Sequence, residues 1–295
     1  MNSLIFWIIA FTVLGGALSV LAAGAFLLLP EGVRARMLSP MVSFAIGALL
    51  GAAFLAILPH AFEVPGVNAH TVTLTVLCGI LVFFLLEKMV IWRHCHTHDC
   101  DVHGGTNVGR SQHPASRDTS TSLYSAGTTR APVLTEYNAL DVDRARHAAT
   151  GNLILIGDGI HNMVDGVLIA AAFLTDIHLG IITSIAVIAH EIPQELGDFV
   201  ILLHSGFSRG RALLYNVLTS LTTLIGGIVA YFSLSLANQL VPYVLAVAAS
   251  SFIYIAVADL IPGLHKRPEF SATVQQIALI ALGVTVIFLA HSTLH

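Results

Sequence analysis

The chain has 295 residues, of which 56% are hydrophobic and only 10% are charged, whereas an ordinary soluble domain carries roughly 25% charged residues. Because a soluble fold cannot hide this much apolar surface, the composition excludes an ordinary globular protein. The formal net charge is −4 and basic residues form no cluster outside the short connections, so the charge also argues against a nucleic-acid-binding protein.

Apolar runs of about 20 residues, the length at which a helix spans the hydrocarbon core, recur along the chain. The sequence therefore predicts an all-α, polytopic membrane protein with eight transmembrane helices in a bundle. The first run is longer than the apolar core of a secretory signal peptide and follows no basic residue, so we expect a retained helix. The expected spans are 4–29, 41–59, 71–92, 148–173, 179–203, 212–236, 241–262 and 272–291.

One long polar segment, 94–147, separates helices 1 to 3 (1–93) from helices 4 to 8 (148–295). Its composition, rich in Ser, Thr, Asp, Arg and His, predicts disorder. It begins with a tract that contains His94, His96 and His98 together with two cysteines. Such a tract can bind zinc without a packed core. We interpret it as a receiver or sensor of metal, with an inert connection as the alternative.

The orientation follows from the basic residues. If the eight spans alternate in direction, all 13 lysines and arginines fall on one side of the membrane. By the positive-inside rule that side is cytoplasmic, and both termini are external. The pattern also supports the count of eight, because one missed or invented span would scramble it. We expect a plasma membrane or an inner membrane.

Six acidic side chains lie inside the expected spans. A charged residue near a helix centre costs about 2.5–3.5 kcal/mol on insertion scales, so such residues usually mark ion or substrate pathways. Protonation or an interfacial position is the alternative for a single acid, but five acids in two adjacent spans favour function. The six are Asp158, Asp165, Glu191, Glu195, Asp198 and Asp259.

The fourth span carries Asp158, then His161 and Asn162, then Asp165, at the helical spacing that places them along one face. The fifth span carries two neighbouring polar stripes, formed by His190, Glu191, Gln194, Glu195 and Asp198. Because the two helices are antiparallel, we expect the polar centres of both spans to meet at mid-membrane depth.

Imidazole and carboxylate ligands suit zinc, ferrous iron or manganese, and the absence of nearby cysteine argues against a copper(I) site. Pro193 frees the carbonyl of Ala189 and predicts a kink beside these ligands. Three other functions stay open. They are an intramembrane metalloprotease, since His190-Glu191 begins a string like H-E-x-x-H, a proton-coupled carrier of another solute, and a metal sensor without transport.

The string His161-Asn162-x-x-Asp165-Gly166 on span 4, followed by His190-Glu191-x-Pro193-Gln194-Glu195-Leu196-Gly197-Asp198-Phe199 on span 5, resembles the ZIP family of divalent-metal transporters. The resemblance covers nearly the whole chain and includes the eight spans, the His-bearing loop and Leu58-Pro59-His60 at the end of span 2. It implies uptake of Zn²⁺, or of Fe²⁺, Mn²⁺ or Cd²⁺, toward the cytoplasm as a transported substrate. It implies no enzyme activity and no prosthetic group, the lipid bilayer and the metal ion as partners, and a homodimer.

By position, the resemblance implies one metal held by His161, Asp165, His190 and Gln194. A second metal would be held by Asn162, Glu191 and the same bridging position. The family commonly has His or Glu where this chain has Gln194, and a neutral amide bridges two metals poorly. We therefore expect one principal metal, loosely held.

Two further residues are candidates for the path to and from this site. Asp259 lies in the cytoplasmic half of span 7 and is a candidate for the exit, with a packing role as the alternative. His60 lies at the outer end of span 2 and is a candidate for the entrance, with simple solvation as the alternative.

Overall fold

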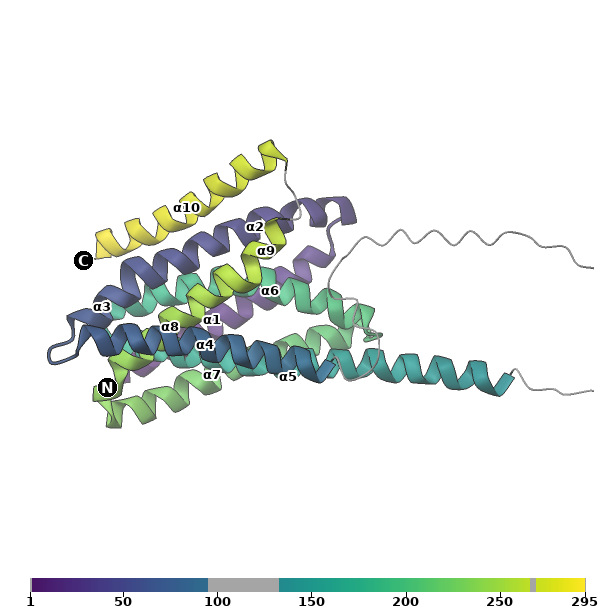
Figure 1. The fold of residues 1–295 in the computed structure, drawn as a ribbon, viewed down its shortest axis with the longest axis horizontal. Helices are drawn as coiled ribbons and strands as arrows, with labels where there is room; N and C mark the ends of the chain where they lie inside the picture. Colours follow the sequence, from purple (N-terminus) through teal and green to yellow (C-terminus); the bar gives the residue numbers. More distant parts are fainter. Residues whose placement is uncertain (1, 95–132, 266–268, 295) are drawn as a thin grey trace, which may run out of the picture.

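The computed structural model describes residues 2–94, 133–265 and 269–294 (Figure 1). Every regular element in these ranges is a helix, which confirms the predicted all-α class. The principal α-helices are α1 (Asn2–Leu27), α2 (Glu31–Gly51), α3 (Leu58–Glu63), α4 (Ala69–His94), α5 (Val133–Thr175), α6 (Ile177–His204), α7 (Arg209–Leu236), α8 (Val241–Tyr254), α9 (Ile261–Leu264) and α10 (Phe270–Leu294).

Eight helical segments in the described ranges are long and apolar enough to cross a membrane, as the sequence predicts, and the protein is a multi-pass membrane protein. They are Ser3–Phe26, Arg36–Glu63, Ala69–Met89, Ile154–Thr175, Ile177–His204, Arg209–Leu236, Asn238–Leu264 and Phe270–Thr293. The described parts of α1 and α10 bring both ends of the chain to the same end of the bundle (Figure 1).

Helix α5 is longer than the sequence predicts. It begins at Val133 and therefore occupies 133–147, the last part of the segment 94–147 that we expected to be disordered. The structure differs from the prediction for these residues. The stretch 133–147 contains neither Gly nor Pro, and Leu, Ala and Arg make up six of its fifteen residues, which favours a helix even where the sequence is polar. This part of α5 projects beyond the other helices (Figure 1). The expectation for 95–132 lies outside the described residues.

Two of the spans change to a wider helix before a proline. The π-helical turns η1 (Ala52–Ile57) and η3 (Ile255–Leu260) join α2 to α3 and α8 to α9. In each span a proline, Pro59 or Pro262, follows two residues after the π-helical turn ends. Since proline has no N–H to donate, a shift in the backbone pairing upstream of it lets the helix continue. A short 3₁₀ turn, η2 (Asn238–Leu240), precedes α8.

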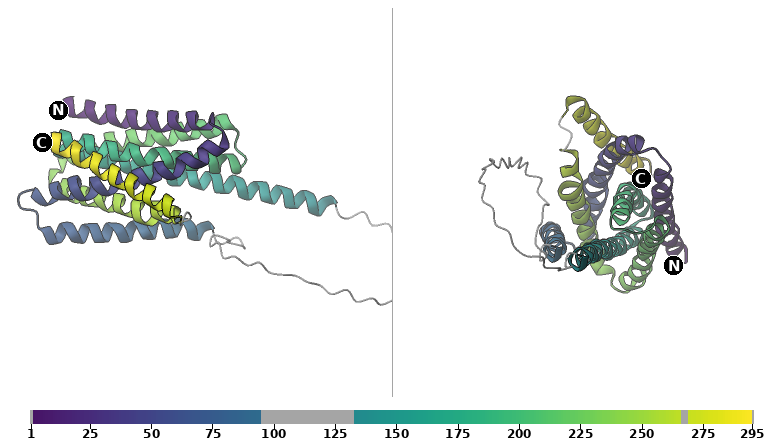
Figure 2. Two further views of the ribbon diagram at one scale, coloured as in Figure 1. Left: turned by 90° about the horizontal axis from the view of Figure 1, so that it is seen from above. Right: turned by 90° about the vertical axis from the view of Figure 1, so that its right-hand side faces the viewer.

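The helix α6 lies near the middle of the bundle (Figure 2). It packs against α1, α2, α5, α7 and α10. Most of its first two-thirds is buried, which is why polar side chains on this helix are shielded from lipid. Pro193 lies within α6, and the helix runs through it without a break.

The most extensive helix contact joins α5 to α7. Gly166 on α5 faces the backbone of Thr223, and Gly226 on α7 faces the backbone of Met163, so closely that a Cβ at either glycine would overlap a carbonyl oxygen. Small residues permit this approach of two membrane helices. The contact fixes the face of α5 that carries His161 and Asp165 toward α6.

Candidate metal centre

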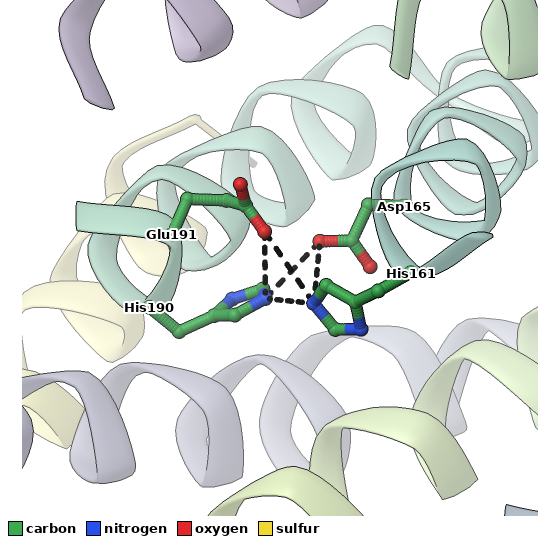
Figure 3. A group of neighbouring side chains, drawn as sticks. All are labelled: His161, Asp165, His190 and Glu191. Carbon is green, nitrogen blue, oxygen red and sulfur yellow. Dashed lines mark hydrogen bonds and ion pairs between the residues drawn. The ribbon is translucent and has the colours of Figure 1, made fainter. Parts of the chain in front are cut away.

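Four side chains from two antiparallel helices converge at one point in the bundle (Figure 3). His161 and Asp165 come from α5, one helical turn apart, and His190 and Glu191 come from the middle of α6. One candidate ligand atom from each of the four lies within 4.8 Å of the others. The helical spacing on α5 and the adjacent pair on α6 thus produce a single cluster.

The shortest contacts of the cluster join the two helices. The Nε2 atom of His190 lies 3.1 Å from Oδ2 of Asp165 and 3.3 Å from Nε2 of His161. Nε2 of His161 lies 3.4 Å from Oε1 of Glu191 and 3.8 Å from Oδ2 of Asp165. Two nitrogen and two oxygen atoms at these separations match a tetrahedral ligand set, in which each atom would stand about 2.0–2.2 Å from a zinc ion.

A backbone contact orients His190 toward the cluster. Its Nδ1 atom lies 3.1 Å from the carbonyl oxygen of Ala186, one turn earlier on α6. If Nδ1 carries the proton and donates it to that carbonyl, Nε2 keeps its lone pair for a ligand. Metal-binding histidines are commonly fixed in this way by a hydrogen bond at the other ring nitrogen.

Three of the four carboxylate oxygens in the cluster are buried without a hydrogen-bond partner. Asp165 and His190 are 0% and 1% exposed, and Glu191 is 4% exposed. Both carboxylate oxygens of Asp165 and Oε1 of Glu191 have no hydrogen-bond partner. Oδ2 of Asp165 and Oε1 of Glu191 lie within ion-pair distance of the histidine nitrogens, but these contacts do not have the geometry of a hydrogen bond. Since burying an unpaired charge is unfavourable, these oxygens require protonated imidazole or a cation for charge balance.

The side chain of His161 is 22% exposed and is the most accessible member of the cluster. The other three members are nearly closed off. The accessible side of the cluster is therefore the side of His161.

A second polar layer lies beside the cluster and includes residues of α7. Asn162, which the resemblance assigns to a second metal, donates from Nδ2 to Oδ1 of Asp158 at 2.8 Å. Its Oδ1 accepts a hydrogen bond from the hydroxyl of Thr223 at 2.8 Å. The amide of Asn162 is thus held between α5 and α7 by hydrogen bonds.

Glu195 belongs to the same layer. It is completely buried and accepts a hydrogen bond from Ser220 at 2.9 Å, while Asn216 donates to its backbone carbonyl at 3.2 Å. Sequence reasoning did not assign Ser220 or Thr223 to this layer. The available signal was a polar stripe at helical spacing on span 6, formed by Asn216, Thr219, Ser220 and Thr223.

The remaining residues that the sequence suggested for the metal site or its path lie outside the four-residue cluster. Gln194 and Asp198 are half-buried on α6, and Asp259 is exposed on η3. His60 lies on α3, and His94 is the last residue of α4. His96 and His98 lie outside the described residues.

Comparison with known proteins identifies similar chains. A family model described as "ZIP Zinc transporter" matches residues 3–291. The chain is 31% identical over 282 residues to the rat protein "Zinc transporter ZIP4", an alignment that covers 86% of this chain and 43% of the rat protein. It is 31% identical over 279 residues to "Zinc transporter ZIP13" of chicken, which covers 87% of this chain and 75% of the chicken protein. The chain thus spans less than half of the length of rat ZIP4.

Proposed function

The chain belongs to the ZIP zinc transporter family, and on that premise we propose that it carries a divalent transition metal, zinc above all, across a membrane through the cluster on α5 and α6. The family match covers nearly the whole sequence, and the relatives named above are described as transporters of zinc. Because these relatives are described as transporters, they do not support the alternative function of a metalloprotease, which the H-E-x-x-H-like string had left open.

The observation that supports this proposal most directly is the cluster of His161, Asp165, His190 and Glu191. The α6 pair lies in the middle of the span Ile177–His204, and Asp165 lies in the middle of Ile154–Thr175. Ionisable side chains at that depth are expensive unless they bind or relay a charge. Two imidazoles with two carboxylates select a borderline transition metal over Mg²⁺ or Ca²⁺, which prefer oxygen ligands alone.

We further propose that one metal is bound principally, by the four residues of the cluster. The amide of Asn162 is engaged on both of its polar atoms, with Asp158 and Thr223. Gln194 supplies only a neutral amide where a bridging carboxylate would be needed. A site for a second metal would therefore lack both a free amide ligand at Asn162 and a bridging carboxylate at position 194.

The proposed direction is toward the cytoplasm. Among the described residues, Arg36, Lys88, Arg209 and Arg211 lie at the starts or ends of helices that meet at the end of the bundle opposite to both termini. The positive-inside rule assigns that end to the cytoplasm. Transport from the end of the termini toward the basic end is then uptake.

Uptake of radioactive zinc into sealed proteoliposomes tests the proposal. The wild type is compared with His161→Ala and His190→Ala, which each remove a nitrogen ligand, and with His204→Ala, an exposed histidine on the same helix α6. We expect saturable uptake in the wild type and in His204→Ala, and its loss in the two site variants. Competition by unlabelled iron, manganese and cadmium ranks the metals. Undiminished uptake in both site variants, reconstituted in equal amounts, would refute the assignment of the site.

A further inference from the structure

A second group of histidine and carboxylate side chains lies at the end of the bundle where both termini are found (Figure 1). An open pocket of about 240 Å³ is lined by Pro59, His60, Glu63 and His291. Its residues come from α3 and from the last turns of α10, and none of them belongs to the α5–α6 cluster. Helices far apart in the sequence thus bring two imidazoles and a carboxylate to one opening.

The imidazole rings of His60 and His291 lie in an arrangement close to that of the central pair. Their centroids are 5.7 Å apart with an interplanar angle of 72°, compared with 5.5 Å and 83° for His161 and His190. Two imidazoles bound to one zinc ion, each with a Zn–N distance of about 2.1 Å, have centroids roughly 5–6 Å apart. The ring separation of the outer pair is therefore compatible with a shared metal.

The orientation of His60 repeats that of His190. Its Nδ1 atom lies 2.8 Å from the carbonyl oxygen of Ala56, four residues earlier, as Nδ1 of His190 faces Ala186. A proton on Nδ1 that is donated to this carbonyl leaves Nε2 as the ligand atom. Glu63, three residues after His60 on the same helix, is exposed and adds a carboxylate to the lining of the pocket.

We propose that His60, Glu63 and His291 form an outer binding site for a divalent transition cation such as Zn²⁺. Three protein ligands leave a fourth coordination position open to water, which distinguishes this site from structural zinc sites with four protein ligands. The binding site does not depend on the transport activity. Its role in collecting metal for the central cluster rests on the proposed function.

Counting bound zinc tests the site itself. Full-length protein in detergent is equilibrated with zinc alone, and the zinc bound per chain is measured in the wild type, in His60→Ala/His291→Ala and in His70→Ala. His70 is an exposed histidine at the start of α4, at the same end of the molecule. We expect the double variant to bind one zinc ion fewer than the wild type, and His70→Ala to bind the same number. Equal zinc in all three proteins overturns the proposal.

Transport kinetics test the role of the site. If the outer site collects metal, His60→Ala and His291→Ala raise the KM for zinc uptake by roughly tenfold or more and leave kcat unchanged, whereas variants of the central cluster lose kcat. An unchanged KM overturns the collecting role. The two proposals can fail separately. If the wild type transports no zinc but still binds one zinc ion more than the double variant, the proposed function fails and the outer site stands.

Discussion

At the scale of single residues, Asp165 is the most telling member of the central cluster. It is fully buried, neither of its carboxylate oxygens has a hydrogen-bond partner, and it stands 3.1 Å from His190. A carboxylate in this setting serves to balance positive charge rather than to hold the helices together. Its neutral amide counterpart should therefore fold and fail to bind.

The substitution Asp165→Asn keeps the shape of the side chain and removes its charge. We expect zinc uptake at low zinc concentration to fall by roughly tenfold or more, with little change in the thermal unfolding temperature. Asp165→Glu, which restores the charge on a longer side chain, should recover part of the uptake. Uptake by Asp165→Asn equal to that of the wild type would show that this carboxylate is not a ligand.

Asn162 should behave differently from the histidine beside it. Its hydrogen bonds to Asp158 and Thr223 join α5 to α7, so Asn162→Ala and Thr223→Val should each lower stability by about 1 kcal/mol and reduce uptake less than His161→Ala does. Thermal unfolding and zinc uptake, measured on the same preparations, check this. Complete loss of uptake in Asn162→Ala with normal uptake in Thr223→Val would instead make Asn162 a ligand.

Helical spacing in the sequence predicted that polar residues of spans 4 and 5 would face each other. The structure brings His161, Asp165, His190 and Glu191 together. Spacing could not predict that Asn162, next to His161, turns toward Thr223, because the rotation of α5 about its axis is set by its packing on α7. It also could not pair His60 with His291, which come from distant helices.

At the scale of helices, the contact between α5 and α7 depends on two glycines. A methyl group at Gly166 or at Gly226 would overlap a backbone carbonyl of the facing helix, whereas one at Gly157, also on α5, would meet nothing within 4 Å. Backbone atoms cannot move aside as side chains can. The helices themselves would have to separate.

We therefore expect Gly166→Ala and Gly226→Ala to lower the thermal unfolding temperature of the purified protein and to reduce zinc uptake. Gly157→Ala serves as the control and should be neutral or stabilising, because alanine favours a helix over glycine by about 1 kcal/mol. If Gly166→Ala unfolds at the same temperature as Gly157→Ala, the close approach of α5 and α7 is wrong.

The sequence predicted the ends of the spans to within six residues, because apolar length is set by the thickness of the membrane. It did not predict the helix over 133–147 or the π-helical turns η1 and η3. A polar composition does not exclude a helix. A π-helical turn changes the backbone hydrogen bonds but not the hydrophobicity of the sequence. Only the prolines that follow η1 and η3 mark these places in the sequence.

At the scale of the whole molecule, the even number of spans places both termini at one end and the described basic residues at the other (Figure 1). Single cysteines introduced in place of Ser3, His70 and Arg209, in a background without native cysteine, test this arrangement. In right-side-out vesicles, a membrane-impermeant maleimide should label the first two positions. It should label Arg209→Cys only after the membrane is opened. Labelling of all three in intact vesicles would contradict the predicted orientation.

The length of α5 links the interior of the membrane to the space outside it. Its 43 residues span roughly 65 Å as a helix, about twice the thickness of the hydrocarbon core. The single helix α5 therefore carries two ligands of the metal cluster within the membrane and extends beyond the membrane at its N-terminal part. A small tilt of the helix at the ligands becomes a displacement of several ångströms at its far tip. A spin label or fluorophore attached to its outer turns would therefore report the tilt of α5 during transport as a change in distance.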